Sequence, residues 1–255
     1  MLAIDLGNTT TKAALWDGDL WNVPPLATFR FPSVDEGHPA IVDDVARHSF
    51  DEVKIASVRD PALQALLRAW PAASPAPVIL SHDSFALDLD VELPERVGVD
   101  RLAAAAAAVR SPLVPSIAGS IAVVDVGTAI TIDRVDRGRN SRPVFRGGYI
   151  LPGPQTSLNG LRAATHALPA LNFAPTSASL RPGRSTVEAM QNGVAALLKA
   201  ALTDLAEAVI EDADTGRVVA AVAAEAFPWL DARSSLVFDP ALVLRGIAAA
   251  EAKAS

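Results

Sequence analysis

Residues 2–16 read LAIDLGNTTTKAALW, and residues 121–135 read IAVVDVGTAITIDRV. Each stretch is an apolar run, then Asp-x-Gly followed by Asn or Thr and by Thr or Ala, then a second alternating run. This pattern is typical of a strand, a tight glycine turn and an antiparallel strand. Asp5 and Asp125 stand 125 − 5 = 120 residues apart, close to half of the 255-residue chain. The repeat therefore predicts two similar domains that arose by duplication.

Strand and helix patterns alternate along the rest of the chain. Strands are expected at 52–58, 78–80 and 217–223, and helices at 60–70, at 101–110, from 185 to about 212 and after Asp239-Pro240. Asp60 is expected as the N-cap of its helix, and Ser185 and Glu188 are expected to form a capping box. The alternation predicts an α/β fold. The Pro- and Ser-bearing stretch 111–120 has loop composition, so we place the domains at 1–115 and 116–255.

Composition excludes several classes of function. With 22 Lys and Arg against 29 Asp and Glu, the net charge is −7, which disfavours binding to nucleic acid or to an anionic membrane. No stretch offers the roughly 18 apolar residues of a membrane span, and the first residues lack the features of a signal peptide. We therefore expect a cytoplasmic protein. The lack of cysteine excludes disulfides and thiol nucleophiles, and the four histidines show no ligand spacing.

The first hairpin turn combines residue types that suit phosphate. Asp5, Gly7, Asn8, Thr9 and Lys12 supply a carboxylate, a flexible glycine, an amide, a hydroxyl and a cation. A glycine turn lets backbone N–H groups approach an anion, and the carboxylate can hold water bound to Mg²⁺. The alternative is an ordinary hairpin whose polar side chains satisfy the turn backbone.

The second turn favours phosphate binding over an ordinary hairpin. The pattern of the first turn is repeated there by Asp125, Gly127, Thr128 and Ala129. Two such turns, one from each domain, favour a site that clamps the phosphates of a nucleotide. The Gly-x4-Gly-Lys spacing of a Walker A loop is missing.

Two further segments carry candidate chemistry. Asp100 beside Arg101 at a helix start suits a general base and an anion-binding cation, or alternatively an N-cap with a solvated arginine. Residues 146–153 read RGGYILPG, which indicates either a loop that lines a cleft or a structural turn. Thr186 is interpreted from the residues alone as an N-cap.

An ordered series of motifs resembles the type III pantothenate kinase family over essentially the whole chain. The motifs are Asp5-x-Gly-Asn-Thr with Lys12, Gly98-Val-Asp-Arg, Asp125-x-Gly-Thr-Ala-x-Thr, Gly147-Gly-x-Ile-x-Pro-Gly, Leu168-Pro, Thr186-Val-Glu-Ala-x-x-Asn-Gly and Leu244-Arg-Gly. The resemblance implies the superfamily of sugar kinases, heat-shock ATPases and actin. Its fold consists of two duplicated ribonuclease H-like (actin-like ATPase) domains with mixed sheets flanked by helices.

The resemblance also implies an activity. Family members transfer the γ-phosphoryl group of ATP to the 4′-hydroxyl of pantothenate, which gives 4′-phosphopantothenate in the first step of coenzyme A biosynthesis. They use ATP, Mg²⁺ and a monovalent cation, either K⁺ or NH₄⁺. They are homodimers with the substrate site at the subunit interface, so pantothenate and a second copy of the chain are the implied partners.

The motifs assign roles by resemblance. The phosphate-binding residues would be Asp5, Gly7, Asn8, Thr9, Lys12, Gly127, Thr128 and Ala129. Asp100 would be the catalytic base, and Asp125 would help to bind the monovalent cation. The pantothenate-binding residues would be Gly98, Val99, Arg101 and, from the neighbouring subunit, Thr186.

The chain departs from the family pattern at two places. Val91 stands where the family commonly has Tyr, and residues 222–226, VAAEA, stand where it has Thr-Gly-Gly-Asp-Ala. Alanine in place of glycine adds Cβ atoms where backbone approaches the nucleoside. These departures motivate two alternatives. One is a catalytically weak homologue that acts as a binding or regulatory protein, and the other is a kinase for a different small hydroxylated substrate.

Overall fold

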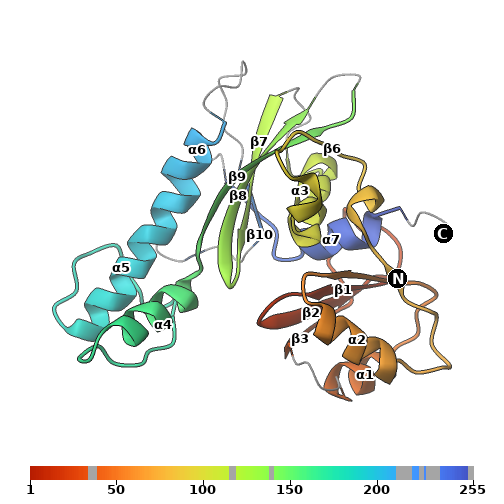
Figure 1. Cartoon of the computed structure of the whole chain (residues 1–255), viewed down its shortest axis with the longest axis horizontal. Coiled ribbons are helices and arrows are strands. Elements are labelled where there is room, and N and C mark those ends of the chain that lie inside the picture. The colour runs from red at the N-terminus through yellow and green to blue at the C-terminus, as the bar shows by residue number, and fades with distance from the viewer. Residues whose placement is uncertain are drawn as a thin grey trace. The chain divides into compact units, whose positions relative to one another are not determined.

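The computed structural model describes residues 1–33, 39–114, 119–137, 141–210, 220–223, 227 and 236–251 (Figure 1). Contacts divide the chain into two units. The first consists of Met1–Ser116, Asn140–Phe145 and Ala241–Ser255, and the second of Ile117–Arg139 and Arg146–Pro240. This division differs from the sequence-based one in the placement of the C-terminal helix, which belongs to the first unit.

The first unit contains a mixed sheet with the strand order β3-β2-β1-β4-β5. Its strands are β1 (Leu2–Leu6), β2 (Thr10–Leu15), β3 (Ala27–Pro32), β4 (Val53–Ser57) and β5 (Val78–Ile79). β1 lies antiparallel to β2 and parallel to β4. Every residue of β1 is buried, as expected for a strand that is covered on both faces.

Helices cover both faces of this sheet, with α1 and α2 on one side and α3 and α7 on the other (Figure 1). The helices are α1 (Pro39–Val45), α2 (Asp60–Ala69), α3 (Val99–Arg110) and α7 (Leu242–Ala249). Ile41 of α1 and Leu66 of α2 share a core with Ile4 of β1. Two 3-10 turns, His82–Ser84 and Pro94–Arg96, and the short strand β6 (Asp88–Leu89) precede α3.

Close packing and buried hydrogen bonds hold α7 in the first unit. A Cβ atom on Gly246 would lie 1.9 Å from the Ala103 carbonyl oxygen, so α7 meets α3 at backbone contact. The alanine-rich face of α3 that allows this approach is buried. The buried Lys54 of β4 donates hydrogen bonds to the carbonyl oxygens of Ala248, at 2.9 Å, and Ala250, at 2.7 Å. A cation at the C-terminus of a helix satisfies carbonyl groups that lack partners within the helix.

The second unit repeats the strand pattern of the first. Its strands are β7 (Gly119–Val126), β8 (Ala129–Arg137), β9 (Val144–Pro152), β10 (Ala220–Ala223) and β11 (Leu236–Phe238). The order is β11-β10-β7-β8-β9, and β9 pairs with β6 through Val144 and Phe145 of the first unit. β7 lies antiparallel to β8 and parallel to β10, as β1 does to β2 and β4. The prediction of an α/β fold with mixed sheets is confirmed.

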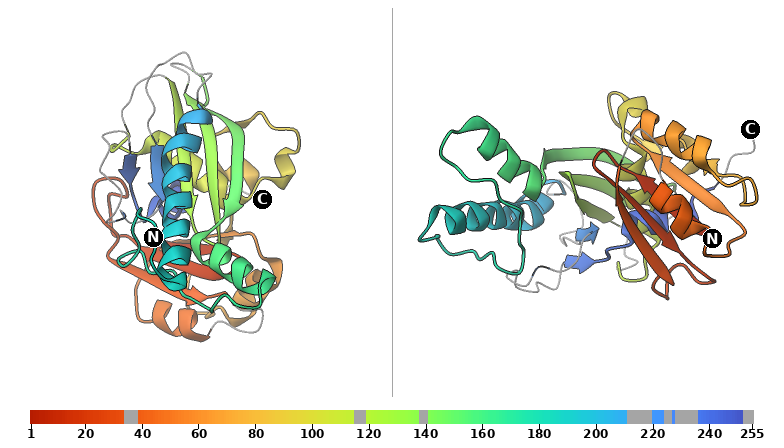
Figure 2. Two further views of the ribbon diagram at one scale, coloured as in Figure 1. Left: turned by 90° about the vertical axis from the view of Figure 1, so that its left-hand side faces the viewer. Right: turned by 90° about the horizontal axis from the view of Figure 1, so that it is seen from below.

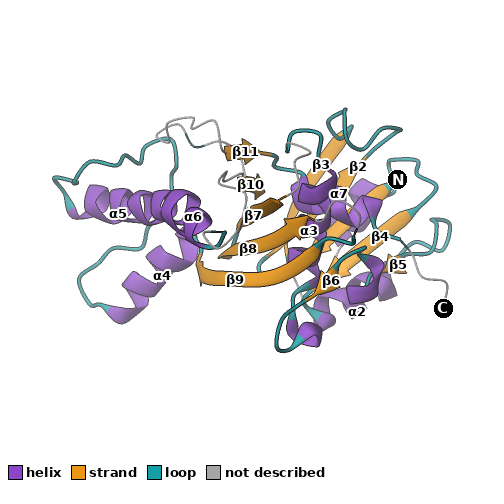
Figure 3. Cartoon of the chain, turned by 90° about the horizontal axis from the view of Figure 1, so that it is seen from above, coloured by secondary structure: helices purple, strands orange, loops and turns teal. Residues whose placement is uncertain are grey.

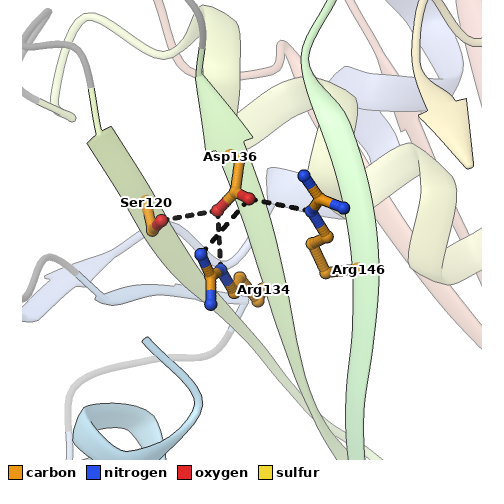
Figure 4. A network of polar contacts seen from close by, with 4 residues as sticks. All are labelled: Ser120, Arg134, Asp136 and Arg146. Atoms are coloured by element: carbon orange, nitrogen blue, oxygen red, sulfur yellow. Dashed lines mark hydrogen bonds and ion pairs between the residues drawn. The ribbon is translucent and has the colours of Figure 1, made fainter. Parts of the chain in front are cut away.

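A polar network links three neighbouring strands of this sheet, β7, β8 and β9 (Figure 4). Ser120 Oγ of β7 donates to Asp136 Oδ1 at 2.5 Å. Arg134 Nε of β8 donates to the same oxygen at 2.7 Å, and Arg146 Nε of β9 donates to Asp136 Oδ2 at 2.8 Å. One carboxylate thereby links three neighbouring strands through charge-assisted hydrogen bonds.

Two helical segments stand beside the second sheet. α4 (Pro154–Ala164) packs against α5 (Thr186–Ala200), with Leu158 and Met190 in a shared apolar cluster (Figure 2). α5 runs through a π-type segment, Ala201–Leu205, into α6 (Ala206–Ala208) (Figure 3). Leu202 and Ala206 pack on the sheet. The predicted end of this helix near Asp212 lies outside the described residues.

The helix starts differ from the predicted caps. α2 begins at Asp60 with Arg59 as its N-cap, so the assignment of Asp60 as the cap was wrong by one residue. Ser185, and not Thr186, caps α5: its Oγ accepts the Glu188 N–H at 3.2 Å. Glu188 reaches back to the N–H of Arg184, at 2.8 Å, so only half of the predicted capping box forms.

No helix in the described parts of the chain is long and apolar enough to cross a membrane.

Candidate functional site

The first candidate turn joins β1 to β2. Gly7 N–H donates to the Thr10 carbonyl oxygen at 3.2 Å, and a Cβ on Gly7 would stand 2.9 Å from that oxygen. Glycine is needed here because any side chain would crowd the turn. Asp5 and Lys12 are register partners across the hairpin. Asp5 is buried and Lys12 is half-buried. Asn8, at the tip of the turn between them, is exposed.

Asp100 lies in the first turn of α3. The N-cap of this helix is Gly98, so the interpretation of Asp100 as the N-cap was wrong. Asp100 Oδ1 accepts the Arg101 N–H at 2.9 Å, and the start of a helix is a favourable place for a carboxylate. A Cβ on Gly98 would stand 2.4 Å from Asp100 Oδ1, so glycine makes room for the carboxylate.

The parallel strands β1 and β4 bring Asp100 and the first turn to one edge of the sheet. The turn follows the carboxyl end of β1, and Val58, the residue after β4, donates its N–H to Leu6 O at 3.1 Å. Gly98 lies against Val58, because a Cβ on this glycine would stand only 3.6 Å from Val58 Cγ1. The carboxyl edge of parallel strands is the usual ligand-binding edge of α/β folds. The first unit thus gathers a carboxylate and a glycine turn at that edge.

Arg101 and Val99 flank Asp100 on α3. The Arg101 guanidinium stacks over the Phe145 ring, 5.5 Å from its centroid, in a cation–π contact that orients the side chain. Val99 is buried and Gly98 is half-buried. Val91 is half-buried and follows Asp90, whose N–H donates to the Phe145 carbonyl oxygen at 3.0 Å.

The second candidate turn joins β7 to β8. Gly127 N–H donates to the Ala129 carbonyl oxygen at 2.9 Å. The Thr128 carbonyl oxygen accepts from Gly153 N–H at 2.9 Å and from Thr156 Oγ1 at 2.6 Å. A Cβ on Gly153 would stand 2.0 Å from the Gly127 carbonyl oxygen, so the backbone at Gly153 packs directly against the backbone of the second turn.

The prediction of a loop at 146–153 was wrong, because residues 146–152 belong to strand β9 and Gly153 is the N-cap of α4. The end of β9 and Gly153 support the second turn. A Cβ on Gly148 would stand 1.8 Å from the Ile132 carbonyl oxygen, which lets β9 approach β8. Thr156, at the start of α4, is a supporting residue that the sequence reasoning missed, although it lies just beyond this Gly/Pro signal.

Asp125 lies near the end of β7 and is half-buried. Its register partner on the parallel strand β10 is Ala223. The departure at Ala224–Ala226 falls outside the described residues.

Thr186 is exposed as the first residue of α5 and lines an open apolar groove of about 950 Å³ between α4 and α5. The other lining residues are Pro152, Thr156, Ser157, Gly160, Leu161, Ala164, Leu168, Ala189, Met190, Gly193, Val194 and Leu197. The side chains of Leu161 and Leu197 remain exposed there.

The carboxylates of the described residues suit a metal ion that takes most of its ligands from a bound phosphate compound and few from the protein. Among these residues, no group of three or more His, Asp or Glu side chains could hold a metal ion by itself. Mg²⁺ in phosphoryl-transfer sites is usually bound by one or two carboxylates together with phosphate oxygens and water. Asp5, beside the first turn, matches that requirement.

Comparisons with known proteins agree with one family. The profile described as Type III pantothenate kinase matches residues 1–208. A Type III pantothenate kinase of Desulfovibrio desulfuricans is 31% identical over 263 residues, which cover 97% of this chain and 94% of the relative. Another, from Rhodopirellula baltica, is 37% identical over 187 residues, which cover 68% of this chain and 65% of the relative.

The chain belongs to the type III pantothenate kinase family. It is accordingly an enzyme of the kinase class. The matched residues 1–208 include all of the candidate site residues from Asp5 to Thr186. The family match and the geometry therefore concern the same part of the chain.

Solved structures agree on the fold. A protein described as a Baf family transcriptional activator from Campylobacter jejuni superposes with a TM-score of 0.56 at 19% identity, and the match covers 97% of this chain and 96% of that one. A 2-dehydro-3-deoxygalactonokinase-like protein from Sinorhizobium meliloti gives a TM-score of 0.50 at 15% identity, with 97% of each chain covered. The pantothenate kinase family member described here thus has a fold similar to that of a sugar kinase.

The structure divides the candidate residues between the two units. Asp5, Gly7, Asn8, Thr9, Lys12, Gly98, Val99, Asp100 and Arg101 lie in the first unit, and Asp125, Gly127, Thr128, Ala129 and Thr186 lie in the second. Within the first unit, Asp100 and the first glycine turn share one sheet edge. Sequence reasoning missed Ser33 and Arg59, which bond to the first turn from outside the motif.

Proposed function

We propose that this protein transfers the γ-phosphoryl group of ATP to the 4′-hydroxyl of pantothenate, in the first step of coenzyme A biosynthesis. The observation that carries the proposal is the placement of Asp100 and the first glycine turn at the same edge of β1 and β4, in a chain of this family. The comparisons favour this activity over a catalytically weak homologue, since relatives aligned over nearly their full length bear the kinase name.

In this proposal Asp100 is the general base. As the 4′-oxygen attacks the γ-phosphorus, its proton passes to the free lone pairs of the Asp100 carboxylate, while the bond from the γ-phosphorus to the bridging oxygen breaks and ADP leaves. The Arg101 N–H bond to Oδ1 holds the carboxylate in place. Arg101, stacked on Phe145, would pair with the pantothenate carboxylate, while Gly98 and Val99 would line the substrate.

Charge neutralisation is the other requirement of the reaction, because ATP, pantothenate and the chain are all negative. Backbone N–H groups of Asn8 and Thr9, with Lys12, would bind phosphate oxygens, and Gly7 would allow the turn that presents them. Asp5 would hold Mg²⁺ through water, and the ion would offset charge on the phosphates. We propose that the second turn, Gly127, Thr128 and Ala129, also binds phosphate, with Gly127 allowing the turn as Gly7 does in the first. We propose further that Asp125 helps to hold K⁺ or NH₄⁺.

The two halves of the chain, 1–115 and 116–255, are proposed to be duplicated actin-like domains. The matching strand orders β3-β2-β1-β4-β5 and β9-β8-β7-β10-β11 support this origin. The use of ATP agrees with the cytoplasmic location expected from the sequence, which stays a prediction.

We also propose a homodimer in which Thr186 reaches the substrate of the neighbouring subunit. The open apolar groove that Thr186 lines supports this, because exposed apolar surface of this kind marks interaction sites. Leu197, 40% exposed in the groove, is a suitable probe.

Replacing Leu197 by Asp is expected to give a monomer. In a two-fold interface the charge would be buried twice, so the dimer dissociation constant should rise by about 100-fold or more. Light scattering after size exclusion measures the mass. The control is Leu26→Asp, because Leu26 is 69% exposed in the first unit and does not line the groove. A dimer that persists in Leu197→Asp, or a monomeric wild type, would contradict this placement of the interface.

The activity is tested by ADP formation in a coupled assay with purified protein, Mg²⁺ and KCl. We expect ADP to form only when pantothenate is present, and to fall at least about 10-fold when K⁺ is replaced by Na⁺, if Asp125 holds the monovalent ion. A panel of sugars and polyols forms the control arm. Faster turnover on one of these acceptors would replace pantothenate as the substrate, and ATP binding without turnover on any acceptor would favour the binding protein.

A further inference from the structure

The first glycine turn is held from outside by two residues that lie beyond its motif. Ser33 Oγ donates to the Gly7 carbonyl oxygen at 2.7 Å, and Ser33 N–H donates to the Thr9 carbonyl oxygen at 2.9 Å. Between them, the Arg59 guanidinium donates from Nη1 to the Asn8 carbonyl oxygen. Three successive carbonyl groups of the turn are therefore occupied.

Occupied carbonyl groups fix the direction of the amides that follow them. In a planar trans peptide, the N–H of one residue points opposite to the C=O of the residue before it. The bond to Gly7 C=O therefore directs Asn8 N–H away from Ser33, and the bond to Asn8 C=O directs Thr9 N–H away from Arg59. Within the described part of the chain, neither of these N–H groups donates a hydrogen bond to protein. They stay available for an anion.

Both residues are themselves well fixed. Arg59 N–H donates to Ser57 Oγ at 3.1 Å, the same hydroxyl donates to Arg59 O at 3.2 Å, and Leu63 N–H donates to Arg59 O at 3.1 Å. The Arg59 backbone thus joins the end of β4 to the start of α2. Ser33 Oγ also shares a hydrogen bond of 3.0 Å with Thr11 Oγ1, whose residue is completely buried on β2.

We propose that Arg59 and Ser33 are positioning residues for nucleotide phosphate. They hold the first turn so that the Asn8 and Thr9 amides face the phosphate oxygens, and the Arg59 guanidinium adds a permanent positive charge next to that turn. This inference rests on the proposed function for the identity of the nucleotide as ATP. It deepens that proposal by assigning roles to residues that no motif of the sequence contains.

The test measures the affinity for a non-hydrolysable ATP analogue with Mg²⁺ by calorimetry, which needs no acceptor. Arg59→Gln is expected to raise the dissociation constant by about 10-fold, the usual effect of one charge-assisted hydrogen bond. Arg59→Lys, which keeps the charge, is expected to recover most of the affinity. Ser33→Ala is expected to cause about a 5-fold loss and Ser33→Thr, which keeps the hydroxyl, little loss.

Arg68→Gln is the matched control, because Arg68 is exposed at the other end of α2. In steady-state kinetics, Arg59→Gln should raise KM for ATP and leave KM for pantothenate within about 2-fold, with a Tm within about 2 °C of the wild type. Because the two residues act on one turn, the effects of Arg59→Gln and Ser33→Ala should not add.

An unchanged analogue affinity in Arg59→Gln would overturn the inference, as would an equal loss in Arg68→Gln. An equal rise in both KM values with a large fall in Tm would show a purely structural role. The failure of the proposed function looks different. In that case the wild type binds the analogue and the variants bind it more weakly, but ADP formation does not depend on pantothenate.

Discussion

Asp100→Asn is expected to lower kcat for pantothenate phosphorylation by about 10²–10⁴-fold, the range typical for the loss of a general base. The amide side chain has nearly the same shape, and its oxygen can still accept the Arg101 N–H that now lies 2.9 Å from Oδ1. It cannot accept the proton of the 4′-hydroxyl. KM for ATP and the Tm should therefore stay close to their wild-type values, and the measurement is steady-state kinetics with both substrates varied.

The control for this variant is Asp60→Asn. Asp60 is also an acidic residue in the first turn of a helix, α2, so the change removes a similar helix-terminal charge. Its kcat should remain within about 2-fold of the wild-type value, because Asp60 has no assigned role in proton transfer. Full activity in Asp100→Asn would remove Asp100 from the role of base. Equal losses in both variants would point to a general electrostatic effect.

Gly246→Ala is expected to destabilise the protein by about 3 kcal/mol, in the upper part of the range for overpacked cores. The added methyl group would stand 1.9 Å from the Ala103 carbonyl oxygen, and that backbone atom cannot turn aside as a side chain could. α7 would have to move away from α3 and from Lys54, whose buried ammonium group would lose its carbonyl partners. Urea unfolding should show a lower midpoint, and the Tm should fall by about 6–12 °C.

Gly160→Ala is the matched control in a helix. A Cβ on Gly160 of α4 would meet no atom within 4 Å, so alanine is expected to raise stability by about 0.5–1 kcal/mol through its better helix propensity. The packing account of α7 would be wrong if Gly246→Ala unfolded at the same urea concentration as the wild type. It would also be wrong if both variants shifted the midpoint in the same direction.

The hairpins were predictable because their signals are local. From Leu2 to Leu15 an apolar run, a glycine turn and an alternating run follow one another, and the structure pairs them with Asp5 opposite Lys12. The same holds for β7 and β8, where Asp125 pairs with Thr131. Helix caps were predicted less well, because a side chain such as that of Asp60 suits both the cap and the first helical position.

The position of α7 could not be predicted in this way. It depends on Gly246 meeting Ala103 and on Lys54 meeting Ala250, residues that lie 143 (246 − 103) and 196 (250 − 54) positions apart in the chain. No local pattern encodes such contacts. Length and the loop composition of residues 111–120 placed the helix with the second half, whereas packing places it with the first.

The candidate site was predictable where residue type itself suggests chemistry, as for Asp100 and the two glycine turns. The residues that hold the two turns in place could not be predicted. Arg59 stands in the stretch Ser57-Val-Arg-Asp-Pro, which matches no motif, and becomes relevant only because β4 runs parallel to β1 and ends beside the first turn. Gly153 was assigned to a loop, whereas it directly follows strand β9, and its role depends on the close approach of its backbone to the second turn.

The central claim is that the chain phosphorylates pantothenate on its 4′-hydroxyl. The most direct measurement is ³¹P NMR of a reaction that contains the purified protein, ATP, Mg²⁺, KCl and pantothenate, with mass spectrometry of the product. We expect one new phosphate monoester resonance, coupled to the 4′ methylene protons, together with an equal amount of ADP. Loss of ATP without that resonance, or a monoester formed only on another acceptor, would contradict the account.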